Sequence, residues 1–406
     1  MSTAQAAPSS PGALPAAGSA LDETYRAISW RLLPFLFVLW VLAWVDRVNV
    51  GFVKLTMLDE LQWSEAVYGL GAGIFFLGYF FFEVPSNLLL QRIGARKTIT
   101  RITLGWGVVC VLMMFVKTPA MFYFLRFLMG VFEAGFYPGV ILYLTYWYPS
   151  ERRAKAFGMF MSASGIAGVI GGPLAGLVMN GLHGTYGWSG WQWVFLIEGV
   201  PSIIAAGVTW FYLTDRPAQA RWLTPAQRQL VEADLARDGS ALGHREERLL
   251  ESLKDKRLWL LIVIFFCVIA ANSSLTFFGP TVVKEAGYTN PATIGWIMAL
   301  SYLCGAAGMV INGLHSDRRA ESRLHCAYAA ALGALGLVLT TVFLKTNPTL
   351  ALAAQALAIV GTMSAIPVFW QLPGRFLAGA AAAGGVALIN SIATWPASAR
   401  RSCSAS

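Results

Sequence analysis

The chain has 406 residues, of which 56% are hydrophobic and only 13% are charged, and its mean hydropathy is +0.59. A soluble domain needs more charge than this to stay solvated, so the composition excludes an ordinary water-soluble protein. The net charge of +9 does not indicate a nucleic-acid partner, because the basic residues fall in short loops between apolar blocks.

Apolar blocks of about 20 residues, the length that a helix needs to cross hydrocarbon, recur along the whole chain. They are continuously apolar, whereas a membrane β-barrel would alternate apolar and polar residues. We therefore predict an all-α fold, a polytopic helical bundle in the lipid bilayer. The predicted spans lie at 32–53, 66–90, 98–116, 119–148, 154–180, 191–213, 257–279, 291–313, 324–344, 349–372 and 376–396.

The charges of the loops alternate along the chain. The loop after the first span is net acidic, and the loop after the fifth contains no Lys, Arg, Asp or Glu. By the positive-inside rule, the amino terminus is predicted to be cytoplasmic in a bacterial-type inner membrane. The basic loops follow the second, fourth and eighth spans and contain Arg92, Arg96, Lys97 and Arg101, then Arg152, Arg153 and Lys155, then Arg318, Arg319 and Arg323.

The chain divides into two halves joined by a polar linker. We predict a disordered tail at 1–23, which has no basic residue before position 20 and so does not resemble a signal peptide. A six-helix half is predicted at 24–213, a cytoplasmic linker at 214–256, and an incomplete second half with spans seven to eleven at 257–396. Within the linker, Thr224 is expected to cap an amphipathic helix that begins at Pro225.

Several kinds of chemistry have no support in the sequence. The five cysteines show no CxxC spacing, and the four histidines show no metal-binding spacing. The phosphate-binding pattern G-x-x-x-x-G-K-[ST] is absent, which argues against ATP-driven transport. We therefore predict no cofactor and no metal, and, because no catalytic constellation stands out, no enzyme activity.

A short polar motif occurs twice, each time after the second span of a half. The first copy runs from Asn87 to Lys97 and the second from Gly313 to Arg319. Either copy alone could be an ordinary basic loop. Two copies at matching places indicate an internal repeat, which transporters use to form one site at the membrane midplane.

The second copy matches the G-x-x-x-D-R loop of the major facilitator superfamily, which the chain resembles, while the first copy departs from it. The glycine-proline run from Gly168 to Gly176 resembles that superfamily's motif in the fifth span, where small residues allow close helix approach. The chain also resembles the anion:cation symporter family, which holds bacterial carriers of sugar acids, tartrate and aromatic acids (phthalate-type permeases). The segments that carry this narrower resemblance are Asp46–Val50, Gly78–Asn87, Leu125–Gly139 and Ala387–Ser391. The resemblance implies twelve spans in two six-helix halves, of which about eleven are present here.

Ionisable side chains inside spans are costly, so each needs a reason. Asp46 and Arg47 interrupt the first apolar block, unless they mark its outer end and face water. Arg126 and Glu133 are seven residues apart, which places both on one helix face. Arg126 could instead belong to an interfacial ion pair, and Glu133 could make a buried structural hydrogen bond.

Two further acidic residues, Glu83 and Glu198, lie inside predicted spans. Glu83 could be a permanently protonated, packed carboxyl or a functional group, and the sequence does not separate the two interpretations. Glu198 is interpreted as a residue that packs against a neighbouring span.

The resemblance implies roles for the remaining candidates. Arg47 would hold the substrate carboxylate, because a guanidinium supplies a permanent charge and a planar fork. Asp46 and Glu133 would be the proton-coupling carboxyls. Tyr79 and Asn390 would hydrogen-bond the substrate, and Arg126 is either a substrate contact or a pairing partner.

The carboxyl end departs from the family. Residues 397–406 form an Arg/Ser/Ala-rich tail that is expected to be aberrant. A one-base deletion would convert the family's usual Ile-Gly-Asn-Leu-x-Gly-Phe into the run from Ile392 to Ser398, so a frameshift is our hypothesis. Arg375 also stands where the family has small residues.

The predicted function is proton-coupled symport of a small organic anion by alternating access, with protons and the bilayer as the other partners and no nucleic acid. The substrate could be a sugar acid, a tartrate-like dicarboxylate or an aromatic carboxylate. A non-transporting membrane sensor on a carrier fold and an inactive truncated carrier are the alternatives. The linker at 214–256 is too short for an enzymatic output domain, which argues against the sensor.

Overall fold

The computed structural model describes residues 17–242, 256–319 and 321–373, and every regular element in these ranges is a helix. The predicted all-α fold class is therefore confirmed. The predicted eleventh span at 376–396, Arg375, Asn390 and the tail at 397–406 lie outside the described residues, as do residues 1–16 of the predicted amino-terminal tail.

The first half contains the predicted six spans, two of which are each divided into two helices. The fourth span is interrupted at Ala134 and Gly135, and the fifth is interrupted at Ser162. The helices are α1 (Ala17–Leu61), α2 (Glu65–Ile93), α3 (Ala95–Met113), α4 (Pro119–Glu133), α5 (Phe136–Trp147), α6 (Ser150–Met161), α7 (Ala163–Gly181) and α8 (Gly190–Tyr212). Short 3₁₀ turns lie between α7 and α8 at η1 (Thr185–Gly187) and after α8 at η2 (Pro217–Gln219).

The linker and the second half follow the same pattern. Their helices are α9 (Pro225–Leu242), α11 (Lys256–Glu285), α12 (Pro291–Arg319), α13 (Arg323–Phe343) and α14 (Pro348–Phe369). Within the described ranges, nine helical stretches are long and apolar enough to cross a membrane. Helix α3 falls short of that measure because its first turns are basic, yet it packs along α8.

The amino-terminal boundary differs from the prediction. Helix α1 begins at Ala17, so residues 17–23 are helical and not part of a disordered tail. Distant residues hold this extension in place: Asp22 forms an ion pair with Arg152, and the Tyr25 hydroxyl donates a hydrogen bond of 2.9 Å to Asp234. The sequence around positions 17–23 does not contain these partners, which explains the error.

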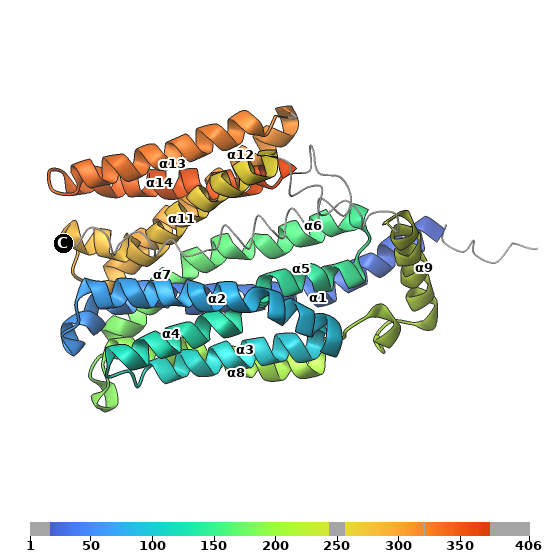
Figure 1. Cartoon of the computed structure of the whole chain (residues 1–406), viewed down its shortest axis with the longest axis horizontal. Helices are drawn as coiled ribbons and strands as arrows, with labels where there is room; N and C mark the ends of the chain where they lie inside the picture. The colour runs from blue at the N-terminus through green and yellow to red at the C-terminus, as the bar shows by residue number, and fades with distance from the viewer. Residues whose placement is uncertain (1–16, 243–255, 320, 374–406) are drawn as a thin grey trace, which may run out of the picture.

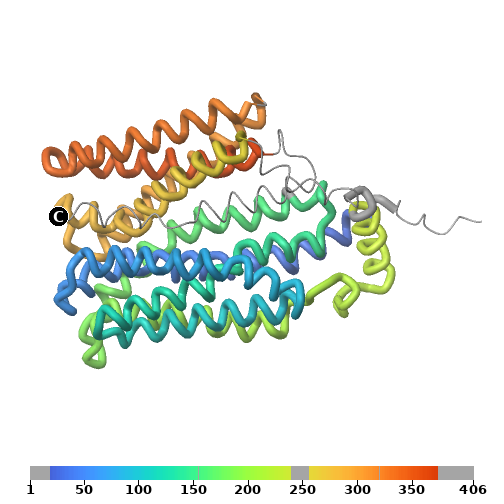
Figure 2. The backbone as a smooth tube through the Cα atoms, in the orientation of Figure 1, coloured from blue at the N-terminus to red at the C-terminus, as the bar shows by residue number. Residues whose placement is uncertain are grey.

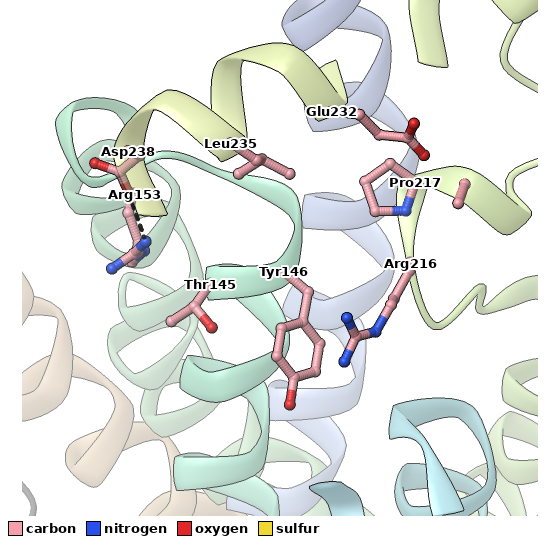
Figure 3. A pocket seen from close by; sticks show the side chains of 9 residues that line it. Thr145, Tyr146, Arg153, Arg216, Pro217, Glu232, Leu235 and Asp238 are labelled. Atoms are coloured by element: carbon pink, nitrogen blue, oxygen red, sulfur yellow. Dashed lines mark ion pairs between the residues drawn. The ribbon is translucent and has the colours of Figure 1, made fainter. Parts of the chain in front are cut away.

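The linker helix α9 begins where the sequence predicted. The Gln227 N–H donates to the Thr224 hydroxyl at 3.2 Å, and the Thr224 N–H donates to the Gln227 side chain at 3.0 Å. This reciprocal pair satisfies two backbone donors at the helix start. Helix α9 then packs against α5. Arg153, in the first turn of α6, forms an ion pair at 3.5 Å with Asp238 of α9 beside a cavity of about 550 Å³ (Figure 3).

The two halves lie side by side, with α9 across one end of the molecule, which we call the linker end (Figures 1 and 2). The junctions between α2 and α3, α5 and α6, and α12 and α13 lie at the linker end (Figure 1). These are the basic loops that the sequence assigned to one face of the membrane.

Helices α7 and α12 form the main contact between the halves. At Gly172 a Cβ atom would lie 2.8 Å from the Gly295 carbonyl oxygen, and at Gly176 it would lie 2.3 Å from that of Pro291. Only glycine permits such approach, which agrees with the interpretation of the glycine-proline run.

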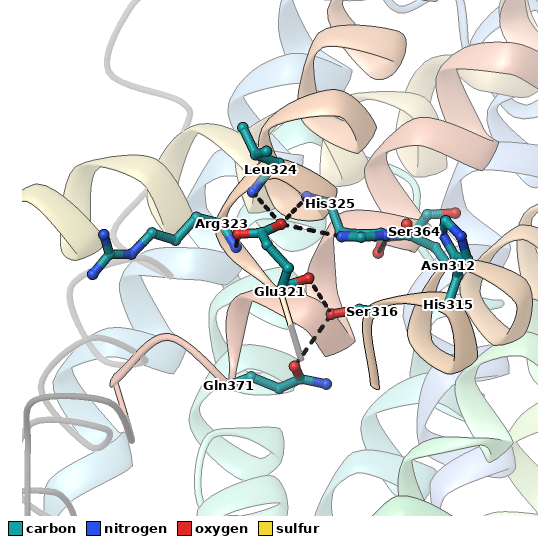
Figure 4. A network of polar contacts seen from close by, with 9 residues as sticks. All are labelled: Asn312, His315, Ser316, Glu321, Arg323, Leu324, His325, Ser364 and Gln371. Atoms are coloured by element: carbon teal, nitrogen blue, oxygen red, sulfur yellow. Dashed lines mark hydrogen bonds and ion pairs between the residues drawn. The ribbon is translucent and has the colours of Figure 1, made fainter. Parts of the chain in front are cut away.

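The second copy of the repeated motif forms a polar network at the linker end (Figure 4). The Gln371 side chain donates to Asp317 at 2.8 Å, and the rings of His315 and His325 share a hydrogen bond of 2.9 Å. Glu321 accepts hydrogen bonds from the first backbone N–H groups of α13. The network thereby fixes the turn between α12 and α13 to the end of α14.

Candidate substrate and proton site

Arg47 of α1 and Glu133 of α4 form an ion pair in the interior of the first half. The Arg47 Nε donates to Glu133 Oε1 at 2.6 Å, and an Nη of the same guanidinium contacts the same oxygen. The Arg47 side chain is 17% exposed while that of Glu133 is 4% exposed. The arginine is thus the member of the pair that a molecule from outside could reach first.

Three aromatic rings surround the Arg47 guanidinium. Its central carbon lies 5.6 Å from the centroids of Trp44 and Phe75 and 5.4 Å from that of Tyr79. Cation–π contacts of this kind hold an arginine in place while leaving its N–H groups for an anion. Tyr79, which we predicted to contact the substrate, is buried within the same group.

Close backbone packing brings α2 and α4 together beside the pair. At Gly130, a Cβ atom would lie 2.0 Å from the Phe75 carbonyl oxygen, so no larger residue fits without a shift of the helices. Helix α4 ends at Glu133, and the following Gly135 packs directly against the Ser86 hydroxyl. The glycines around Glu133 therefore set the position of its carboxylate.

Arg126 lies two turns before Glu133 on α4 and is buried. Its Nε donates only a long hydrogen bond, 3.5 Å, to the Gly71 carbonyl, and one of its Nη atoms has no hydrogen-bond partner among the described residues. Its guanidinium lies 4.8 Å from the ring of Phe75 and 5.9 Å from that of Phe277 on α11. Arg126 therefore lies between the halves, with a donor that is not used.

Asp46 lies on a different side of α1 from Arg47. It is buried against α3 and α8, where it accepts a hydrogen bond of 2.6 Å from Ser202 and one of 3.4 Å from the Cys110 thiol. Glu198 is buried one turn before Ser202 on α8. The structure therefore brings together Arg47, Glu133 and Tyr79 but places Asp46 in a second polar cluster, which contains Ser202 and Cys110.

The remaining predicted residues are placed as follows. Glu83 is buried on α2, one turn beyond Tyr79. Asn390 lies outside the described residues. The sequence analysis did not single out Ser202, Cys110, Trp44 or Phe75, although a serine in the apolar helix α8 one turn after Glu198 was a usable signal.

At the end opposite α9, the halves are joined by polar contacts that we call the outer contact. Lys284 of α11 donates to the Leu55 carbonyl at 2.8 Å and lies 3.1 Å from the Asp59 carboxylate. The Tyr68 hydroxyl donates to the Phe277 carbonyl at 2.8 Å. Both contacts connect the first half to α11, so in this structure the halves are closed together at that end.

Two helical halves that meet around buried charged residues are an arrangement typical of membrane transport proteins. The chain matches the model of the Major Facilitator Superfamily over residues 35–400 and belongs to that superfamily. It is therefore a multi-pass membrane transporter and not an enzyme, which confirms the superfamily resemblance seen in the sequence.

Individual relatives agree with this assignment. The chain is 42% identical over 367 residues to a protein of Agrobacterium vitis named "Putative tartrate transporter", covering 90% of this chain and 84% of that protein. It is 41% identical over 371 residues to the "Quinolone resistance transporter" of Acinetobacter baumannii, covering 91% and 85%. Among solved structures, a bacterial homolog of the human lysosomal transporter Spinster, in an inward-facing and occupied conformation, superposes with a TM-score of 0.71 at 18% identity and covers 91% of this chain and 79% of that one.

Proposed function

We propose that this chain carries a small organic anion together with protons across a bacterial-type inner membrane, by alternating access and with its amino terminus in the cytoplasm. The observation that carries the proposal is the Arg47–Glu133 ion pair beside Arg126. The Agrobacterium vitis relative, which is named as a tartrate transporter, supports an anionic substrate.

The ion pair couples the proton to the substrate by competition. While Glu133 is ionised, its carboxylate accepts hydrogen bonds from the Arg47 guanidinium. A substrate carboxylate then cannot bind the same N–H donors. A proton on Glu133 removes that negative charge and releases the Arg47 N–H groups for the substrate. Proton and anion then bind together and leave together, which is the requirement for symport.

Arg126 supplies the second positive charge. Its unused Nη donor and its position beside Phe277 suit a substrate group that lies between the halves. Two arginines that contact the Phe75 ring favour a substrate with two anionic or polar ends, such as a sugar acid or a hydroxy dicarboxylate. Tyr79 and Asn390 are proposed as hydrogen-bonding contacts, the latter from family resemblance alone.

Asp46 is proposed as a second proton-coupling carboxyl. Because it hydrogen-bonds Ser202 and Cys110, it would take up its proton inside the first half and without touching the substrate. Its charge state would then act on the substrate site through the adjacent backbone of α1.

Substrate-gated proton flux tests the proposal directly. The purified protein is reconstituted into vesicles that contain a pH-sensitive dye, and sugar acids, tartrate and aromatic acids are added one at a time. We expect at least one acid to carry protons inward, and a neutral sugar to carry none. Accumulation of an acid that is unaffected by collapsing the proton gradient would contradict proton coupling.

A second candidate function is export of a drug-like molecule. It is favoured by the 41% identical quinolone resistance relative and by the aromatic rings around Arg47. The same vesicles separate the two functions, because an exporter would exchange internal protons for the external drug and would acidify the medium on the opposite side from a symporter.

A further inference from the structure

A cavity at the linker end of the first half has no role in the transport mechanism described above. Its volume is about 670 Å³, which is within the range of small-molecule sites. It forms where the start of the α1 span, the start of α3 and the end of α8 meet the chain that leads to α9. Its principal lining residues are Arg31, Arg96, Tyr212, Asp215, Arg221 and Trp222.

Three buried N–H donors at this cavity have no acceptor among the described residues. They are the Nε atoms of Arg31 and Arg96 and the indole Nε1 of Trp222. Buried donors are nearly always hydrogen-bonded, because leaving one unpaired costs about 1–3 kcal/mol. All three are donors, so the molecule that would satisfy them must present acceptors.

Aromatic rings hold two of the guanidinium groups in place. Arg31 lies 4.5 Å from the Tyr212 ring centroid and 4.9 Å from that of Trp222. Arg96 lies 5.4 Å from the ring centroid of Trp210. Such stacking fixes the planes of the donors before any ligand binds.

The charge of the cavity favours an anion. Three arginines and a single carboxylate, Asp215, line it, and none of these arginines forms an ion pair with a described residue. Asp215 accepts the Arg96 backbone N–H at 2.7 Å and lies against Gly94, so it is directed at the start of α3. The three Arg side chains are therefore left without a neutralising partner.

Exposed aromatic residues place the mouth of the cavity at the membrane surface. Trp30 is 76% exposed and precedes Arg31, and Phe211 is 87% exposed and itself lines the cavity. Large rings left exposed at the ends of membrane helices are typical of the headgroup level of the bilayer. A ligand at this position can thus keep acyl chains in the membrane while its polar group enters the cavity.

We propose that this cavity binds the phosphate group of an anionic phospholipid in the leaflet at the linker end. Phosphate oxygens satisfy several donors at once, and arginine forks match them in geometry and charge. The bound headgroup would join α1, α3 and α8 to the linker through Arg221 and Trp222. Free inorganic phosphate has the same chemistry without the acyl chains, so the test includes both sources.

The test uses the full-length purified protein in a neutral detergent. Thermal unfolding is followed while phosphatidylglycerol, an uncharged diacylglycerol with the same chains, or sodium phosphate at constant ionic strength is added, and native mass spectrometry detects retained lipid. We expect phosphatidylglycerol to raise the melting temperature and remain bound, while diacylglycerol and phosphate at equal concentrations do neither. Equal stabilisation by diacylglycerol, or by phosphate alone, would overturn the lipid assignment.

Variants test whether this cavity is the site. Arg221→Gln changes an exposed side chain and leaves the packing intact, and Arg31→Gln removes a buried donor. Each should weaken phosphatidylglycerol binding about tenfold, the loss expected for one charge-assisted hydrogen bond. The matched control is Arg92→Gln, an exposed arginine at the end of α2, which should bind lipid like the unmodified protein. If Arg221→Gln folds and binds lipid as tightly as Arg92→Gln, the proposal is wrong.

Discussion

The two halves share an architecture but differ in what they bury. In the first half the buried polar residues include charged side chains, whereas in the described part of the second half they are all uncharged. The charged residues of the first half are Asp46, Lys54, Glu83, Arg126, Glu133 and Glu198, and the neutral ones of the second half include Asn272, Thr276, Ser301, Gln355, Thr362 and Ser364. The buried charged groups therefore lie in the first half. The buried polar groups of the described second half are neutral hydrogen-bonding side chains.

The neutral residues of the second half pair within that half. Gln355 donates to the Gly279 carbonyl at 3.1 Å, and the Thr276 and Tyr302 hydroxyls are 3.0 Å apart. Such contacts hold α11, α12 and α14 together. An internal repeat thus preserves helix arrangement without preserving the chemistry of individual positions.

The sharpest test of this difference between the halves compares one alanine substitution in each half. Arg47→Ala should reduce uptake by about 100-fold or more, because a lost charge-assisted contact to a carboxylate is worth about 3 kcal/mol and Glu133 is left buried and unpaired. Gln355→Ala should reduce it only a few-fold. Initial uptake rates in vesicles measure both, and size-exclusion profiles check folding. Equal losses would show that the charge chemistry is shared between the halves.

A smaller effect on uptake is expected at Arg126, where a substitution can keep the positive charge and change the shape of the side chain. Arg126→Lys retains a cation but loses the planar fork, so we expect KM for the anion to rise about tenfold with a smaller change in kcat. Concentration-dependent uptake measures this split. An unchanged KM would remove Arg126 from the substrate contacts and leave it as a packing residue beside Phe75.

Substitutions in the Asp46 cluster test whether the Asp46 carboxyl couples protons or has a structural role. Asp46→Asn keeps the shape and can still accept a hydrogen bond from Ser202, but it cannot ionise. If Asp46 exchanges protons, the pH profile of uptake will change while the melting temperature is largely kept. The matched variant Ser202→Ala should lower stability by about 1 kcal/mol and leave the pH profile in place. The reverse pattern would assign Asp46 a structural role.

The outer contact should have a weaker influence, because its ion pair is exposed to solvent. Lys284→Ala removes both the Asp59 and the Leu55 contact, so we expect the two halves to separate more often at that end. Spin labels at Gln62 and Tyr288 report this as a longer distance component. Glu285→Ala, at the neighbouring position on α11, is the control and should give an unaltered distribution.

The smallest effect concerns the turn between α12 and α13. Desolvation raises the pKa of Glu321, but hydrogen bonds from the Leu324 and Arg323 N–H groups and from the His325 side chain together lower that pKa below its ordinary value. A lowered folded-state pKa means that Glu321 stabilises the turn above its unfolded-state pKa. This contribution is lost as the pH falls through the folded-state value.

Hydrogen exchange at Arg323 and Leu324 checks the Glu321 prediction. Protection of these amides relative to Glu321→Gln should be present at neutral pH and should disappear in acid. Protection that is identical in the two proteins at neutral pH would contradict it.

The sequence predicted most of the fold and part of the site, for identifiable reasons. Span positions follow from runs of apolar residues, and the shared face of Arg126 and Glu133 follows from their spacing. The pairing of Arg47 with Glu133 depends on how α1 packs on α4, which no local pattern encodes. The start of α1 at Ala17 depends on Arg152 and Asp234, which are distant in the chain.

Asp46 illustrates a signal that was present but not used. Consecutive residues on a helix point about 100° apart, so Asp46 and Arg47 could not both face one site. The helix break at Ala134–Gly135 likewise had a sequence signal, because Gly135 is closely followed by Pro138 and Gly139, and these residue types break helices.

The central claim is that a proton on Glu133 releases Arg47 for the substrate anion. The most direct measurement compares Glu133→Gln with the unmodified protein in vesicles, once with an imposed proton gradient and once with equal pH and labelled anion exchanged for unlabelled. We predict that Glu133→Gln loses gradient-driven accumulation but keeps exchange, because glutamine leaves the Arg47 fork permanently available. Accumulation by Glu133→Gln that equals that of the unmodified protein would contradict the mechanism.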